Sequence, residues 1–370
     1  MNFIQRHHER VIGWWLLICC AVLLVLVIVG GATRLTGSGL SMVEWQPLTV
    51  IPPTSEEAWT REFDAYRASP EYQQINRGMS LGEFKVIYWW EFSHRLLARG
   101  LGLVFALPLA WFWWRGMVPQ RLRWPLLGLL ALGGLQGWLG WYMVQSGLVD
   151  IPRVSPYRLA AHLGLALVIF AIMFRMAIRL MWPREGPRPE RSWRPWTLSL
   201  LALASLTILS GAFVAGLNAG LSYNTFPLMG GRIVPDGYLG LEPLWRNLFE
   251  NTAAVQFNHR LLAILTATVA LLAWWRVWRV ESERKIRMAF HVLAAIVLVQ
   301  VGLGITTLLT HVPVTLGTAH QGVAVLVLSA VIAADYVVSR KIDSRKSARS
   351  RASIHQGRRS TDLSSAGSGA

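Results

Sequence analysis

The chain has 370 residues, of which 53% are hydrophobic, and the apolar residues fall in blocks of about 20, the length that a helix needs to cross a bilayer. Lysine and arginine (36 residues) exceed the 20 acidic residues, which gives a formal net charge of +16. The basic residues are dispersed among short connections and the tail, so a nucleic-acid-binding domain is excluded and a polytopic membrane protein is predicted.

Eight apolar blocks follow one another, and each predicts a transmembrane helix. They cover residues 13–33, 96–114, 125–145, 159–181, 196–216, 257–278, 288–309 and 315–338. Arginine and lysine gather in alternate connections and beside both ends of the chain. The positive-inside rule therefore predicts that both termini lie in the cytoplasm.

The first connection on the opposite side, residues 34–90, is long and carries helix signals of its own. Two stretches predict capping boxes: Thr54-Ser-Glu-Glu57 and Ser80-Leu-Gly-Glu83. After the first box, aromatic residues recur at amphipathic spacing at Trp59, Phe63 and Tyr66. A helix from the second box to the end of the next apolar block would be about 50 Å long, so it is expected to project beyond the outer surface or to bend where it enters the membrane.

The chain also repeats itself. Glu91-Phe-Ser-His-Arg-Leu-Leu-Ala98 returns as Gln256-Phe-Asn-His-Arg-Leu-Leu-Ala263, and Gln136-Gly-Trp-Leu-Gly140 returns as Gln300-Val-Gly-Leu-Gly304. Helices one to four thus repeat as five to eight. Because each unit has an even number of spans, the prediction is an all-α integral membrane protein of two parallel four-helix repeats, related by a pseudo-twofold axis along the membrane normal.

This repeat predicts the division of the chain into two halves and a tail. The boundary is expected near Glu185 to Glu190, which gives an N-terminal half of residues 1–185 and a C-terminal half of residues 186–338. Residues 339–370 are rich in Arg, Ser and Gly and are predicted to be a disordered, basic cytoplasmic tail.

Four of the nine histidines occupy matched positions in the two halves: His94 and His162 in the first, His259 and His320 in the second. Each lies near the outer start of a predicted helix. Two imidazoles that face each other from neighbouring helices can hold both axial positions of a haem, which predicts one metal-binding pocket per half. Zinc is the competing metal, but a structural zinc site needs four clustered ligands, and the chain has no CxxC or HxxxH pair.

The residues next to these histidines distinguish the halves. Arg95 and Arg260 each follow a histidine, where they can bind haem propionates or extend to the lipid headgroups, and both interpretations stay open. Three residues before the histidine the first half has Glu91 and the second has Gln256. A carboxylate can carry protons and an amide cannot, so the first half is the candidate for chemistry and the second for electron storage. The competing interpretation places Glu91 at a wet interface without a catalytic role.

Several of these stretches resemble the heme A synthase family, in the form shared by alphaproteobacteria and mitochondria. They are Glu83-Phe-Lys-Val-Ile-Tyr-Trp-Trp-Glu-Phe-Ser-His-Arg95, Gly31-Ala-Thr-Arg34, Asn258-His-Arg260 and Thr318-Ala-His320, and the likeness extends over roughly residues 10 to 338. The resemblance implies an oxidoreductase of the bacterial inner membrane. Such an enzyme oxidises the C8 methyl group of heme O to a formyl group in two steps, giving heme A for cytochrome oxidase.

The resemblance also implies roles for the matched residues. Heme O would bind between His94 and His162 with Glu91 assisting catalysis, and a resident haem b would bind His259 and His320. Expected partners are heme O, the heme O synthase that supplies it, an electron donor, the assembly of cytochrome oxidase, membrane lipid and, for a homo-oligomer, further copies of the chain. Two alternatives are a diheme cytochrome b that oxidises quinol and a transporter with parallel repeats, which would leave the four histidines unexplained.

Overall fold

A computed structural model describes residues 3–44, 51–148, 152–183 and 192–339. Within these ranges the regular structure is helical, apart from an isolated bridge between Met229 and Arg232. Eight helices among them are long and apolar enough to cross a membrane, which confirms the all-α, eight-span prediction. They are α1 (Phe3–Leu35), α4 (Leu81–Trp114), α5 (Gln120–Gln145), α6 (Pro156–Met181), α7 (Arg194–Gly216), α8 (Thr252–Val280), α9 (Arg284–Leu309) and α10 (Val314–Val338).

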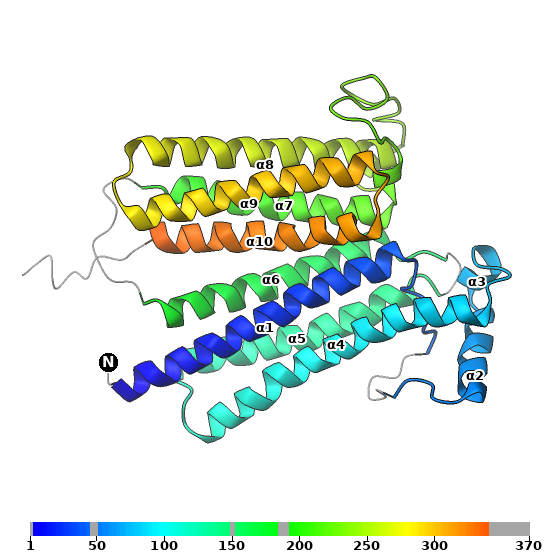
Figure 1. Ribbon diagram of the computed structural model, residues 1–370, viewed down its shortest axis with the longest axis horizontal. Coiled ribbons are helices and arrows are strands. Elements are labelled where there is room, and N and C mark those ends of the chain that lie inside the picture. Colours follow the sequence, from blue (N-terminus) through cyan, green and yellow to red (C-terminus); the bar gives the residue numbers. More distant parts are fainter. Residues whose placement is uncertain (1–2, 45–50, 149–151, 184–191, 340–370) are drawn as a thin grey trace, which may run out of the picture.

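The long helices lie side by side, and the helices that correspond in the sequence repeat have corresponding neighbours (Figure 1). In the first group of helices, α1 and α4–α6, α1 contacts α4 and α6, and α5 contacts α6. In the second group, α7–α10, the corresponding contacts are those of α7 with α8 and α10, and of α9 with α10. Contacts of α1 with α10, and of α6 with α7 and α10, join the groups. The pseudo-twofold axis itself stays a prediction, and the predicted boundary near 185–190 and residues 340–370 of the tail lie outside the described residues.

One pair of helices breaks this correspondence. Helix α4 contacts α5 far less than α8 contacts α9, although the two pairs occupy matched places in the repeat. The first group is therefore the more open of the two at this position.

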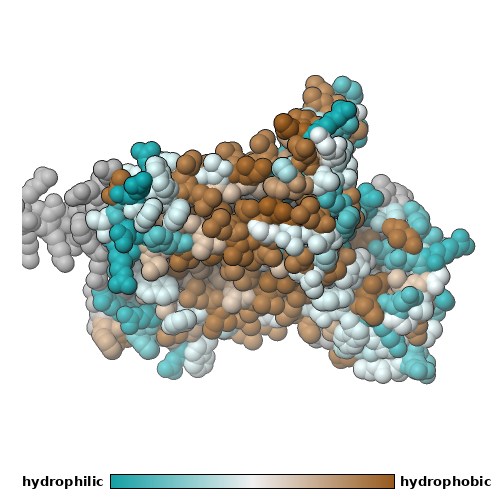
Figure 2. Space-filling model, turned by 45° about the horizontal axis from the view of Figure 1, so that its top comes forward, coloured by the Kyte–Doolittle hydropathy of each residue, from teal (hydrophilic) through white to brown (hydrophobic). Residues whose placement is uncertain are grey.

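The outer surface of the helices matches a lipid environment. Hydrophobic residues cover the middle of the molecule and hydrophilic residues gather toward its two ends (Figure 2). Large apolar side chains such as Leu107, Trp138 and Leu298 are exposed along the helices. Soluble monomers rarely expose apolar patches of this extent, so the chain is a multi-pass membrane protein. Cys19 and Cys20 are buried in the core of the first group.

The long connection between α1 and α4 forms a compact cap, which consists of α2 (Glu56–Arg67) and α3 (Pro70–Gln74) packed on the start of α4. Trp59, Phe63 and Tyr66, predicted to share one helix face, are all buried in an aromatic cluster with residues of α4. Two short 3₁₀ helices, η1 (Ala219–Leu221) and η2 (Leu244–Leu248), lie in the connection between α7 and α8.

The helix starts partly match the predicted capping boxes. Ser80 and Glu83 form the predicted box: the Glu83 N–H donates to Ser80 Oγ at 3.3 Å, and the Ser80 N–H donates to Glu83 Oε2 at 2.8 Å. The first box was placed one residue early. Ser55, not Thr54, is the N-cap of α2, and its hydroxyl oxygen accepts from the Ala58 N–H. The residue three positions after Ser55 is Ala58 and not an acidic residue, so α2 begins with a side-chain N-cap and not with a capping box.

Candidate functional site

The four predicted histidines occupy matched places in the two groups of helices. Each lies on one of the four helices whose first residues are at the cap-bearing end of the molecule: α4, α6, α8 and α10. His94 and His162 lie on α4 and α6 of the first group, and His259 and His320 lie on α8 and α10 of the second. Each pair therefore sits within one helix group.

Every one of these rings packs against a glycine of a neighbouring helix. A Cβ atom built on that glycine would lie closer to a ring atom than ordinary van der Waals contact allows. The distances are 3.0 Å for Gly30 and His94, 3.1 Å for Gly140 and His162, 3.2 Å for Gly211 and His259, and 2.8 Å for Gly304 and His320. A side chain at any of these positions would displace the ring. The glycines thus set how far each imidazole extends into the interior, although the sequence analysis did not single them out for this purpose.

Polar neighbours hold two of the rings. Gln136 on α5 donates from Nε2 to the carbonyl oxygen of His162 at 3.0 Å, and the same nitrogen is 3.3 Å from both ring nitrogens. Ser210 on α7 lies 2.8 Å from His259 Nδ1 through its hydroxyl. At His259 this partner on Nδ1 leaves Nε2 for a metal, whereas Gln136 distinguishes neither ring nitrogen of His162. Gln136 was visible in the sequence as part of the repeated Gln-to-Gly stretch, whereas no signal marked Ser210.

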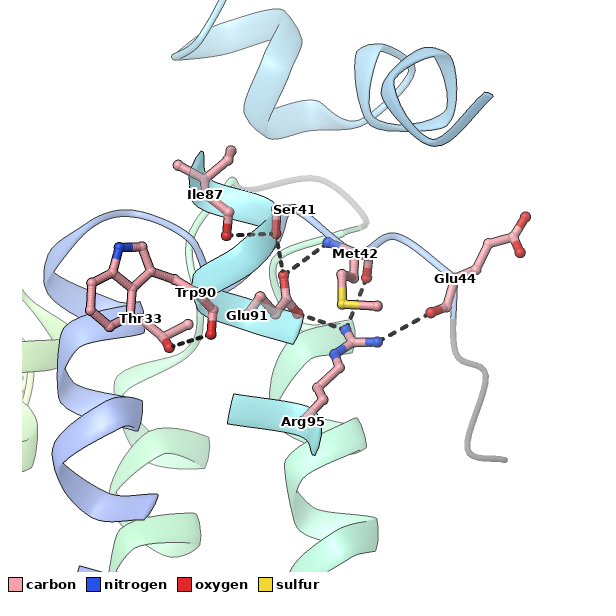
Figure 3. A network of polar contacts seen from close by, with 8 residues as sticks. All are labelled: Thr33, Ser41, Met42, Glu44, Ile87, Trp90, Glu91 and Arg95. Atoms are coloured by element: carbon pink, nitrogen blue, oxygen red, sulfur yellow. Dashed lines mark hydrogen bonds and ion pairs between the residues drawn. The ribbon is translucent and has the colours of Figure 1, made fainter. Parts of the chain in front are cut away.

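Glu91 is the centre of a buried network beside the first pair (Figure 3). Its Oε2 accepts from the Ser41 hydroxyl at 2.7 Å and from the Met42 N–H at 2.8 Å, and its Oε1 accepts from Arg95 NH2 at 2.7 Å. Arg95 also donates to the carbonyl oxygens of Met42 and Glu44. The two side chains therefore fix the segment that follows α1 over the outer end of the first site.

The second half holds the matched segment in another way. Arg260 donates to the carbonyl oxygens of Tyr223 at 2.7 Å and Thr225 at 2.8 Å. Gln256, which is 2% exposed, donates from Nε2 to the same Tyr223 oxygen at 3.0 Å. Both arginines thus bind backbone carbonyl groups, a role that the sequence did not predict. Their contact with haem propionates stays a prediction.

Arg34, part of the Gly31-Ala-Thr-Arg34 stretch, joins the two groups of helices at their outer end. Its NH2 donates to the carbonyl oxygens of Ala215 at 3.0 Å and Gly216 at 3.3 Å, and to Asn218 Oδ1 at 3.1 Å. The last carbonyl groups of a helix lack partners within the helix, so Arg34 caps the end of α7.

The residues present fit haem better than zinc. Among the described residues, no three His, Cys, Asp or Glu side chains come together as a metal-binding group. A tetrahedral zinc site is thus disfavoured, whereas buried imidazoles beside glycines of neighbouring helices are residues that could hold a haem iron.

Comparison with known proteins shows the family of the chain. The family model described as cytochrome oxidase assembly protein matches residues 13–332. The chain belongs to this family. Its curated relatives include a heme A synthase of Rhodospirillum centenum, which is 52% identical over 82% of this chain and 81% of the relative. A heme A synthase of Sinorhizobium medicae is 51% identical over 82% of this chain and 83% of its own. The family extends to plants: the heme A synthase COX15 of Arabidopsis thaliana is 44% identical over 84% of this chain and 71% of its own.

Proposed function

We propose that the protein is a heme A synthase, an oxidoreductase that converts heme O to heme A for cytochrome oxidase. The observation that carries this proposal is the similarity to enzymes of that name along most of the chain. These relatives are named heme A synthase, and neither is named as a diheme cytochrome b acting on quinol, the alternative function. The reaction takes the C8 methyl group through a hydroxymethyl to a formyl group, and each step removes two electrons.

The N-terminal half, residues 1–185, is proposed to take heme O, with His94 and His162 as iron ligands. The C-terminal half, residues 186–338, is proposed to keep a resident haem b on His259 and His320. When bound, that haem supplies one-electron transfer. The division is supported by the asymmetry beside the histidines, because the first half alone has an ionisable side chain at the position of Glu91.

Glu91 is proposed to serve this site in two ways. It lies one helical turn before His94 on the same face, where a carboxylate can hold or take a proton during the oxidation of the methyl group. It also keeps Arg95 and the Ser41–Glu44 segment in place, through the three hydrogen bonds that its carboxylate accepts. The protein's own contribution is thus to orient the substrate ring and to exclude water from its outer edge.

The enzyme is proposed to lie in the bacterial inner membrane with both termini in the cytoplasm. The support is the concentration of arginine and lysine on the side opposite the cap. The haem ligands, at the cap-bearing end, would then lie near the outer face. Heme O synthase is proposed as the partner that supplies the substrate. With dioxygen as the oxidant, each step also takes up two electrons from a donor as one oxygen atom is reduced to water, so an electron donor is proposed as a second partner. Association into a homo-oligomer is part of the proposal.

Product analysis tests the proposal. Membranes that contain the protein and are supplied with heme O should form heme A, identified by the mass of the extracted porphyrin, and the purified protein should retain haem b. His259→Ala and His320→Ala should each lose the resident haem b. Retention of two haem b groups without any conversion of heme O would establish the diheme cytochrome instead.

A further inference from the structure

The two halves differ inside the membrane, on the stripe of α5 that faces the first site. This stripe contains Leu122, Leu126 and Leu129, all buried, and continues through Gly133 to Gln136 and Gly140, which contact His162. Positions three and four residues apart share a helix face, so Gly133 faces the interior. Nevertheless Gly133 is exposed, and a Cβ atom built on it would meet nothing within 4 Å. Open space therefore lies where a packed core is expected.

The matched position in the second half is filled. The repeat that aligns Gln136 with Gln300 and Gly140 with Gly304 aligns Gly133 with Val297. Val297 is 4% exposed and belongs to the core of the second group. The same stretch of helix is thus closed by a valine beside His320 and left open beside His162.

The facing helix shows the same difference. Gly102 on α4 is exposed, with nothing within 4 Å of a built Cβ atom, whereas its counterpart Ala267 on α8 packs against the second core. In addition α4 stands away from α5, while α8 and α9 pack closely. The two open positions, Gly133 and Gly102, thus lie on α5 and α4, the neighbouring helices of the first group that contact each other least.

The chemistry of the two haems fits this asymmetry. Heme O carries a long isoprenoid side chain that haem b lacks, and such a chain is favoured in apolar surroundings. A resident haem b needs no space beyond its ring, but a substrate with an apolar chain must reach its site and leave it again. We propose that the space beside Gly133 receives the isoprenoid chain of heme O, and that this glycine makes the first site selective for heme O over haem b. The inference rests on the proposed function and names the part of the site that recognises the substrate.

Binding measurements on the purified protein with its resident haem in place test the inference. Gly133→Val introduces the side chain found in the second half and so fills the space without breaking the helix. Heme O is then expected to bind roughly tenfold more weakly, a change that lies within the usual cost of overpacking a fitted site. Haem b, titrated as the probe without the isoprenoid chain, should bind the first site as in the parent. In assays of heme A formation the KM for heme O should rise more than kcat falls.

Gly134→Val is the matched control, since it makes the same change one residue away on the exposed side of α5, where a Cβ atom also meets nothing within 4 Å. It should leave both affinities unchanged. Equal weakening of heme O and haem b by Gly133→Val would show that the residue positions the ring, and unchanged heme O affinity would show that the chain lies elsewhere. Either result overturns the inference. A parent protein that prefers heme O but forms no heme A would instead contradict the proposed function and leave the recognition of the isoprenoid chain standing.

Discussion

At the scale of single residues, Glu91 and Gln256 occupy matched places but use opposite hydrogen-bond chemistry. Glu91 accepts from the Met42 N–H, whereas Gln256 donates to the Tyr223 carbonyl oxygen. A carboxylate can only accept hydrogen bonds, whereas an amide has both a donor and an acceptor. The segment after α1 is therefore held through a backbone N–H, and the segment after α7 through a backbone carbonyl group. The negative charge in the first half is matched by Arg95 at 2.7 Å, with both side chains nearly buried.

Glu91→Gln should keep the outer segment in place and remove the proton chemistry. The amide oxygen can still accept from Ser41 and Met42, so resident haem b should stay near normal. Heme A formation should fall by about a hundredfold or more, the usual contribution of a positioned acid or base, and heme O or the hydroxymethyl intermediate should accumulate. Extraction of the haems and mass analysis give the result. Formation of heme A at the parental rate would remove Glu91 from the reaction.

Gly304→Ala should displace His320, because the new Cβ atom would lie 2.8 Å from the ring. Overpacking of this kind costs about 1–3 kcal/mol, and we expect the resident haem to be bound correspondingly more weakly. The haem content and the low-spin spectrum of the purified protein measure this. Gly302→Ala is the control on the same helix, since nothing lies within 4 Å of its built Cβ atom. Equal haem content in both variants would contradict the role given to Gly304.

At the scale of elements, the cap of α2 and α3 depends on one buried carboxyl group. Glu71 is 7% exposed, and Tyr66 donates to it from its hydroxyl at 3.1 Å. Burial raises the pKa of Glu71 from its ordinary value of 4.5 to about 7, with the opposite effects of Tyr66 and Arg34 smaller. The folded cap thus binds a proton more tightly than the unfolded segment does.

The resulting pH dependence has a definite sign. The stabilisation is fully present below about pH 4.5 and is lost as the pH rises through about 7. Protection of residues 56–74 against hydrogen exchange, corrected for the intrinsic exchange rate at each pH, should therefore fall between pH 5 and pH 8. Glu71→Gln, which is neutral throughout, should remove most of this fall. Asp64→Asn, at an exposed position of the same cap, should not. Identical pH profiles for the parent and Glu71→Gln would show that another group titrates.

At the scale of the whole molecule, the direction of insertion decides on which side of the membrane the haem ligands lie. The connection between α4 and α5 is basic, as are the residues beside both ends of the chain, whereas the connection between α7 and α8 is not. A reporter active only outside the cytoplasm should work when inserted near Asp236 and fail when inserted near Gly116. The reverse pattern would place both histidine pairs at the cytoplasmic face.

The sequence alone determined the number of spans, the matched positions of the four histidines and the difference between Glu91 and Gln256. Hydropathy and internal repetition are read along one segment at a time, so these features needed no knowledge of the packing. Only the tertiary structure decided that Arg95 holds the Met42 and Glu44 carbonyl groups, that a glycine lies against each ring, and that the space beside Gly133 is open. These contacts depend on the rotation and spacing of helices that are distant in the sequence. The repeated segments pack at different distances in the two halves, so the position of Gly133 is open and the matched position of Val297 is closed.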